Sequence, residues 1–214
     1  MSADKVVLDT SHFDSKARQW DENPVFRERA EKIAAGLRAA VPLSRAMRAL
    51  DYGSGSGLLS FPLKDELGFI TLKDTSAGML AVAQEKIAAQ GVRNMAVRQT
   101  DLIAEPLPDE RYDLIYSSMT LHHIPDTDAI LRTFRDLLNP GGWLALADLD
   151  QEDGTFHGLE VDVHHGFSRE ALAAKVVAAG FEPPRFETVF EIVKEQPAGK
   201  RAYPVFLMVA RRAG

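Results

Sequence analysis

The stretch Ala49–Ser60, "ALDYGSGSGLLS", joins a short apolar run to a turn in which every second residue is glycine, at Gly53, Gly55 and Gly57. Glycine loses more backbone freedom on folding than any other residue, so this density indicates a turn that a ligand approaches closely. The carboxylate of Asp51 lies at the mouth of the turn. The stretch therefore predicts a buried strand that ends in a ligand-binding turn.

Three kinds of ligand are compatible with a glycine-rich turn. A Walker phosphate loop requires a lysine, which this turn lacks, and a dinucleotide fingerprint requires a third glycine at the position of Leu58. An acid at the end of the next apolar run, Asp74, lies 23 residues after Asp51 and suits the hydroxyls of a ribose. A pyrophosphate would be repelled by Asp51. The acids instead favour a ligand that carries a ribose and a positive centre.

Short apolar runs alternate with helical patterns on both sides of the turn, which predicts an α/β fold with a doubly wound, mostly parallel sheet. Asn23 and Pro24 are typical of a helix start, and Ser168 and Gly180 of a later helix start and end. The run Asn139–Gly142, "NPGG", is expected to stop the helix before it. The strand-like stretches are "MRALDY", "FITLKD", "NMAVRQT", "YDLIYSS", "WLALADL", "RFETVFEIVK" and "YPVFLMVARR".

The bulk composition limits the classes of function. A length of 214 residues suits one domain, and the absence of cysteine excludes disulfides and thiolate chemistry. The net charge of −6 argues against nucleic acid as a partner. No apolar run is long enough to span a bilayer and the start of the chain has no secretory pattern, so we expect a cytoplasmic protein. The oligomeric state is not predicted.

Five stretches carry a resemblance to a known family: "LDYGSGSG", "LKDTSAGMLAVAQEKI", "TDL", "YDLIYSSMTLHHI" and "LLNPGGWLALADLD". In order and spacing they resemble the motifs of class I S-adenosylmethionine-dependent methyltransferases, in the small-molecule branch around the ubiquinone/menaquinone-biosynthesis enzymes. The resemblance runs from about Met47 to Asp150. It implies a Rossmann-like sheet of seven strands with the last one antiparallel, and S-adenosyl-L-methionine as cofactor with S-adenosyl-L-homocysteine as product.

The resemblance also implies where the cofactor binds. The glycine turn would pass close to the methionine part, Asp74 would hold the ribose, and Asp101 would accept from the adenine amino group. The full implied set is Asp51, Gly53, Ser54, Gly55, Gly57, Asp74, Thr75, Met79, Asp101, Leu102, Ser117 and Ser118. Plainer roles stay open for some of these residues, since Met79 suits a core position and Asp101 suits a turn.

Candidates for catalysis are His122, His123 and Asp148, because a general base is needed if the acceptor must lose a proton. Adjacent histidines on a helix point in different directions, so at most one of the pair should face a pocket. Phe13, Trp20 and His157 are candidate lid or substrate residues. No metal site is predicted, because the histidines show no metal-binding spacing.

We expect one domain over residues 1–214, with an N-terminal lid and helix (1–41), a cofactor-binding core (47–150), a substrate cap (151–167) and the end of the sheet (168–214). The expected function is in-line methyl transfer to a small organic acceptor. The stretch "SSMT" replaces the motif used for amino methylation of nucleic acid bases. Two alternatives remain: an NAD(P)-dependent oxidoreductase, and a non-catalytic protein that senses S-adenosylmethionine.

Overall fold

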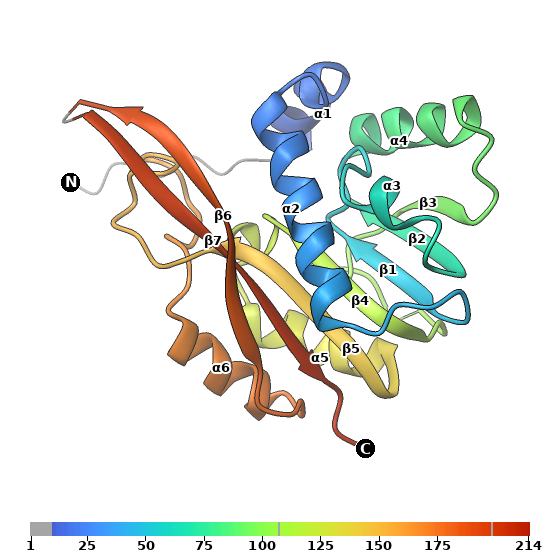
Figure 1. Cartoon of the computed structure of the whole chain (residues 1–214). Helices are drawn as coiled ribbons and strands as arrows, with labels where there is room; N and C mark the ends of the chain where they lie inside the picture. Colours follow the sequence, from blue (N-terminus) through green and yellow to red (C-terminus); the bar gives the residue numbers. More distant parts are fainter. Residues whose placement is uncertain (1–9, 107, 198) are drawn as a thin grey trace.

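The structure is a computed structural model that describes residues 10–106, 108–197 and 199–214. They form one seven-stranded sheet with helices on both faces (Figure 1). The strand order is β3-β2-β1-β4-β5-β7-β6. Strand β7 runs antiparallel to both of its neighbours, β5 and β6, and the other described pairs of strands are parallel. The Rossmann-like fold expected from the sequence is thus confirmed. Residues 1–9 of the expected lid lie outside the described residues.

The strands and helices alternate along most of the chain. The strands are β1 (Arg48–Tyr52), β2 (Phe69–Asp74), β3 (Met95–Gln99), β4 (Tyr112–Ser118), β5 (Leu138–Leu149), β6 (Arg185–Gln196) and β7 (Gly199–Arg211). The helices are α1 (Thr10–Trp20), α2 (Pro24–Ala40), α3 (Ser60–Leu63), α4 (Ala77–Ala89), the 3-10 turn η1 (Leu121–His123), α5 (Thr127–Leu137) and α6 (Arg169–Ala178). None of the helices in the described part of the chain is both long and apolar enough to cross a membrane.

Local signals in the sequence mark the helix ends. The side chain of Asn23 accepts from the backbone N–H of Val25, and that of Ser168 accepts from Ala171 at the start of α6. These bonds satisfy N–H groups that have no partner inside the helix. Gly180 takes a φ of +95° just after α6, a conformation that glycine adopts readily. The expected start of α2 and the expected start and end of α6 are confirmed.

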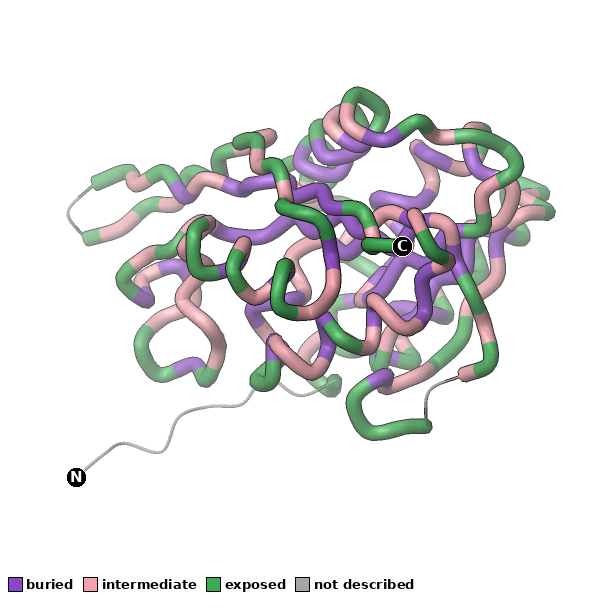
Figure 2. The backbone as a smooth tube through the Cα atoms, turned by 90° about the horizontal axis from the view of Figure 1, so that it is seen from below, coloured by how far each residue is buried: buried purple, intermediate pink, exposed green. Residues whose placement is uncertain are grey.

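Two hydrophobic cores lie on opposite faces of the sheet. One contains apolar side chains of α2, α3 and α4, such as Leu37, Leu63 and Ala83. The other contains those of α5 and α6, such as Phe134 and Leu172. Figure 2 shows the central strands as a buried band between exposed loops. Because both faces are covered, ligands can reach the sheet only at the ends of its strands.

Two features differ from the expectation. Helix α1 had no helical signal in the sequence, since its residues are mostly polar. The run Asn139–Gly142 follows the end of α5 at Leu137, as expected, but it lies within β5, which begins before the expected strand "WLALADL". The register passes from Tyr112 opposite Leu138 to Leu114 opposite Trp143, so β5 advances five residues where β4 advances two. This irregularity accommodates Pro140 and the glycines without breaking the strand.

Candidate active site

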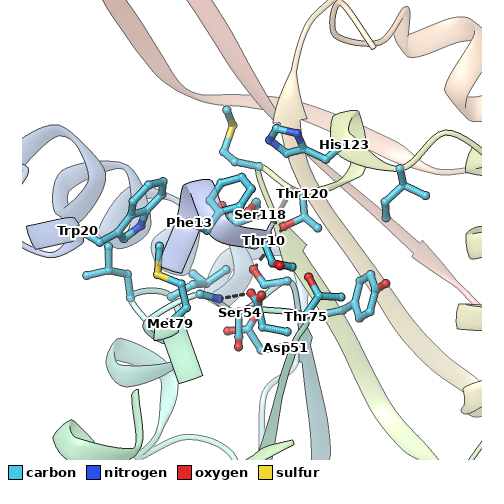
Figure 3. A pocket seen from close by; sticks show the side chains of 18 of the residues that line it. Thr10, Phe13, Trp20, Asp51, Ser54, Thr75, Met79, Ser118, Thr120 and His123 are labelled. Atoms are coloured by element: carbon cyan, nitrogen blue, oxygen red, sulfur yellow. Dashed lines mark hydrogen bonds between the residues drawn. The ribbon is translucent and has the colours of Figure 1, made fainter. Parts of the chain in front are cut away.

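A cavity of about 510 Å³ opens at the carboxyl ends of β1, β2 and β4. The strand order reverses between β1 and β4, which is where sheets of this type bind ligands. Side chains from α1, the glycine turn, the end of β2 and the segment after β4 line it (Figure 3). The volume is in the range of small-molecule sites.

The three glycines of the turn serve different purposes. All have positive φ, at +66° for Gly53, +53° for Gly55 and +81° for Gly57. A methyl group added to Gly53 would overlap the side chain of Thr120, and one added to Gly57 would meet Leu72 at 2.9 Å. A methyl group on Gly55 would meet only the Met79 sulfur, at 3.8 Å. Gly55 therefore leaves its side open to the cavity.

Asp74 joins the glycine turn to the start of α4. Its carboxylate accepts from the backbone N–H of Gly55 at 2.7 Å and from that of Ser76 at 2.8 Å. Ser76 in turn caps α4 by accepting from Met79. Burial raises the pKa of Asp74, against the effect of the backbone hydrogen bonds. Asp74 lines the cavity, and each of its oxygens has a further lone pair for a ligand.

Asp51 is the most deeply buried acid of the cavity. Its carboxylate accepts from Ser60 Oγ at 2.7 Å, and that hydroxyl lies 2.7 Å from the Tyr116 hydroxyl. Burial raises the pKa of Asp51 to about 7, and the nearby charge of Asp74 adds to this. A cation bound beside Asp51 would favour its charged form. The site is therefore suited to a positively charged ligand.

Arg29 also lines the cavity, and the sequence did not point to it. It is 9% exposed, and its guanidinium lies 5.0 Å from the centre of the Phe26 ring. Burial lowers the pKa of Arg29 to about 10, so it stays charged at neutral pH. No ion pair with a described residue holds it. Its position four residues before Ile33 and eight before Leu37, on the buried stripe of α2, is a signal that could have revealed it.

Helix α1 covers one side of the cavity. Phe13 and Trp20 both line the cavity, and the edge of the Phe13 ring packs against the ring of His123 at a centroid distance of 5.5 Å (Figure 3). Asp14 accepts from Ser76 Oγ at 2.6 Å and from the Gly78 N–H at 2.8 Å. These bonds attach α1 to the start of α4.

A second attachment lies at the other end of α1. Asp21 accepts from Lys86 Nζ at 2.5 Å and from the hydroxyl of Ser56. Lys86 also donates to the Ser56 carbonyl at 2.9 Å. Helix α1 is thus fixed to both the glycine turn and α4.

Most of the expected cofactor residues line the cavity, but Gly57, Leu102 and Ser117 do not. Leu102 is buried in the core, and its neighbour Ile103 lines the cavity instead. Ser117 donates to the Tyr52 carbonyl at 2.7 Å. The lining residues of the expected set are Asp51, Gly53, Ser54, Gly55, Asp74, Thr75, Met79, Asp101 and Ser118.

The sequence left open whether Asp101 lines the cofactor site or belongs to a turn, and in the structure it does both. It lines the cavity, and its Oδ1 accepts from the Ile103 N–H at 2.9 Å in a local turn. Met119, just after β4, is another lining residue that the sequence did not indicate. Its φ of +54° is unusual for a residue with a side chain, and such strain often occurs at functional sites.

The histidines adjoin the cavity beyond the glycine turn. Of His122, His123 and His157, only His123 lines the cavity. His122 Nδ1 donates to Asp148 at 2.7 Å, and both side chains are buried. Burial lowers the pKa of His123 to about 3 and that of His157 to about 4, so both are neutral at pH 7. At most one histidine of the adjacent pair was expected to face a pocket, and the structure agrees.

Comparison with known proteins places the chain in a family. Residues 43–200 match a family model described as a methyltransferase domain. The match covers most of the chain. The chain belongs to this methyltransferase-domain family. The matched segment of the methyltransferase domain contains the glycine turn, Asp74, Asp101 and the three histidines, whereas Arg29 and α1 lie before it.

Curated relatives agree with the family. An uncharacterised methyltransferase of Mycobacterium tuberculosis is 36% identical over 110 residues, which is 51% of this chain and 54% of that protein. A ubiquinone/menaquinone biosynthesis C-methyltransferase of Shewanella frigidimarina is 28% identical over 155 residues, which is 71% of this chain and 61% of that protein. The chain thus spans about half the length of the first of these relatives.

Solved structures share the fold of the methyltransferase domain. DhpI in its complex with SAH is 24% identical, with a TM-score of 0.70 over 96% of this chain and 95% of that one. Phosphoethanolamine N-methyltransferase 2 of Haemonchus contortus, in complex with S-adenosyl-L-methionine, is 17% identical, with a TM-score of 0.72 over 86% of this chain and 53% of that one. At these identities the likeness concerns the fold.

Proposed function

We propose that the chain transfers a methyl group from S-adenosylmethionine to a small organic acceptor. The observation that carries the proposal is the set of charges around the glycine turn. Asp51, Asp74 and Asp101 line one cavity together with the buried guanidinium of Arg29. S-adenosylmethionine has a sulfonium, an ammonium, a ribose, an adenine and one carboxylate, and no phosphate. The residues of the cavity suit the ammonium, the ribose, the adenine and the carboxylate.

The residues are assigned to the cofactor as follows. Asp74 accepts from the ribose hydroxyls, Asp101 accepts from the adenine amino group, and Met79 packs against the ring. Asp51 and the glycine turn hold the ammonium end, and Arg29 neutralises the carboxylate. A buried guanidinium without an acid of its own is stabilised when an anion binds beside it. The sequence did not point to Arg29, so its role at the carboxylate comes from the structure alone.

The cavity is poorly suited to a dinucleotide. A pyrophosphate would lie against the glycine turn, where the carboxylates of Asp51 and Asp74 would repel it. Leu58, at the position of the missing fingerprint glycine, lines the cavity. Both observations count against an NAD(P)-dependent oxidoreductase.

When bound, S-adenosylmethionine supplies a methyl group activated by the positive sulfur. The chain then has to orient the acceptor and exclude water, which are the main sources of catalysis in a displacement of this kind. Phe13 and Trp20 of α1 line the cavity and shield it from solvent. His123 also lines the cavity, and we assign it to contact with the acceptor. A cavity of about 510 Å³ favours a small acceptor over a macromolecule.

The proposal is tested by calorimetry with S-adenosylmethionine and NADH as separate ligands. We expect binding of S-adenosylmethionine with one equivalent per chain, and NADH binding alone would contradict the proposal. A screen of small acceptors for release of S-adenosylhomocysteine then separates an enzyme from a non-catalytic sensor. A sensor would bind the cofactor and release no product with any acceptor.

The ribose assignment is tested by Asp74→Ala. The loss of a charged acceptor should weaken S-adenosylmethionine binding by about 1.5–3 kcal/mol. Asp74 also holds the Gly55 N–H, so the thermal melting of the variant is measured in parallel. Unchanged affinity in a folded variant would refute the ribose role.

A further inference from the structure

Three imidazoles that are separated in the sequence meet beside the cavity. His122 and His123 belong to η1, and His157 lies in the segment 151–167 after β5. One ring nitrogen of each residue can be chosen so that all three atoms lie within 4.8 Å of one another. The proposed methyl transfer assigns no role to this cluster as a unit.

The spacing within the cluster is close to that of ligands on one ion. His122 Nε2 lies 3.0 Å from His157 Nε2. Two imidazole nitrogens bound to one tetrahedral zinc ion lie about 3.3 Å apart, given Zn–N bonds of about 2.0–2.1 Å. The rings of His123 and His122 lie at a centroid distance of 4.1 Å, and those of His123 and His157 at 5.4 Å. Small side-chain adjustments would bring the three nitrogens around one ion.

Asp148 orients one member of the cluster. Its Oδ1 accepts from His122 Nδ1 at 2.7 Å, and its Oδ2 accepts from the His122 backbone N–H at 3.2 Å. This contact directs the Nε2 lone pair of His122 toward His157. A carboxylate that holds the far nitrogen of a histidine is a common partner of metal-binding imidazoles, because it sets the ring orientation and increases the basicity of the ligand.

His157 is also held in place. The carbonyl of the preceding residue, Phe156, accepts from Lys194 Nζ at 2.5 Å, and its N–H donates to Glu152 at 3.1 Å. The Phe156 ring packs edge-on against the imidazole, with a centroid distance of 4.9 Å. These contacts connect the segment to β6 and present His157 to η1. The third imidazole is therefore positioned by the fold.

We propose that His122, His123 and His157 bind one divalent transition-metal ion, with Zn²⁺ as the probe that suits three imidazoles. Three nitrogen ligands leave the fourth position of a tetrahedral ion open. Because His123 lines the cavity, an oxygen or nitrogen of a small acceptor can reach that position. The role in holding an acceptor rests on the proposed function, whereas the binding of the ion does not.

The test uses the full chain after treatment with a chelator, without S-adenosylmethionine. Zn²⁺ is titrated in competition with a chromophoric chelator, and Co²⁺ is added separately to record its visible absorption. We expect one equivalent per chain and a Co²⁺ spectrum typical of four-coordination. His157→Gln should weaken Zn²⁺ binding at least tenfold and remove the Co²⁺ bands, and Asp148→Asn should weaken it about 10–100-fold.

His165→Gln is the matched control, since this histidine belongs to the same segment but lies outside the cluster. It should leave the affinity unchanged, and thermal melting establishes that each variant is folded. Absence of stoichiometric binding in the wild type would overturn the proposal, as would equal affinity in wild type and His157→Gln. Calorimetry with S-adenosylmethionine on the same metal-free sample tests the methyltransferase proposal independently.

Discussion

At the scale of single residues, the cavity depends on charges that the fold holds out of water. Asp51 and Arg29 are both buried, and neither has an ion pair with a described residue. Burial makes the charged form of each costly, which is seen in the raised pKa of Asp51 and the lowered pKa of Arg29. A ligand with one ammonium and one carboxylate would relieve both costs at once.

The pKa of Asp51 predicts how cofactor affinity depends on pH. A bound ammonium favours the carboxylate, so binding releases a proton from Asp51 wherever the free protein still holds one. With a pKa of about 7 in the free protein, affinity for S-adenosylmethionine should fall about tenfold between pH 8 and pH 6. Calorimetry at both pH values measures this. Asp51→Asn is the control, and it should bind more weakly with little change between the two.

The raised pKa of Asp51 also makes the free energy of unfolding depend on pH. The folded chain holds a proton on Asp51 that the unfolded chain loses near its ordinary pKa of 3.8. The contribution of Asp51 to the free energy of unfolding is therefore present below pH 4 and is lost as the pH rises through about 7. At pH 8, Asp51→Asn should raise the free energy of unfolding by about 1 kcal/mol or more, as measured by urea denaturation. A lower value would contradict the burial argument.

The glycines of the turn provide a matched pair of variants. Both Gly55→Ala and Gly57→Ala place a side chain at positive φ, at a cost of about 1–2 kcal/mol. Only Gly57→Ala adds an overlap with Leu72, so it should melt at the lower temperature. Gly55→Ala should instead lose at least tenfold in cofactor affinity, because its new methyl group points into the cavity. Equal effects of the two changes on binding would refute this division.

At the scale of elements, α1 is attached to the fold by two acids rather than by a large apolar face. Asp14 contacts the start of α4, and Asp21 contacts Lys86 and the glycine turn. Ala17 is its only fully buried residue. Such an element can separate locally while the sheet remains folded. We therefore expect opening of α1 to give ligands a route into the cavity.

The double variant Asp14→Ala/Asp21→Ala tests this lid. Loss of both attachments should speed hydrogen exchange of the α1 amides and weaken cofactor binding about 3–10-fold, with little change in global melting. Arg18→Ala is the control, because its ion pair with Glu85 is largely exposed and contributes little. Unchanged exchange in the double variant would show that other contacts hold α1.

At the scale of the whole molecule, the site and the core are connected. Tyr52 lines the cavity, and its ring packs edge-on against the buried Phe134 of α5 at 5.4 Å. The layer of α5 and α6 therefore supports the cavity from the face opposite α2. The turn at Gly53, the end of β4 and this layer together fix the floor of the site.

Phe134→Ala should lower the free energy of unfolding by about 3–5 kcal/mol, because it leaves a cavity under β1 and β4. Urea denaturation followed by circular dichroism and by tryptophan fluorescence should show one coincident transition. Two separate transitions would mean that the sheet and its helices unfold independently. Saturating S-adenosylmethionine should raise the midpoint in wild type and variant alike.

The sequence by itself determined the succession of strands along the chain, the helix starts at Asn23 and Ser168, and the glycine turn with Asp51 and Asp74. These features are local: a capping serine or asparagine, a glycine at positive φ and a buried apolar run act within a few residues. The run Asn139–Gly142 ends α5 as expected, but its place inside β5 was not predicted, because that depends on the pairing of the flanking Leu138 and Trp143 with β4 across the sheet.

Only the tertiary structure decided which distant residues share the cavity. Arg29 reaches it because α2 packs on the sheet, and α1 covers it through bonds to residues more than sixty positions away. His122 and His157 meet across 35 positions because β4 and β5 are neighbours and end at the same edge. No spacing in the sequence encodes that contact, since parallel strands bring together segments whose separation depends on the connections between them.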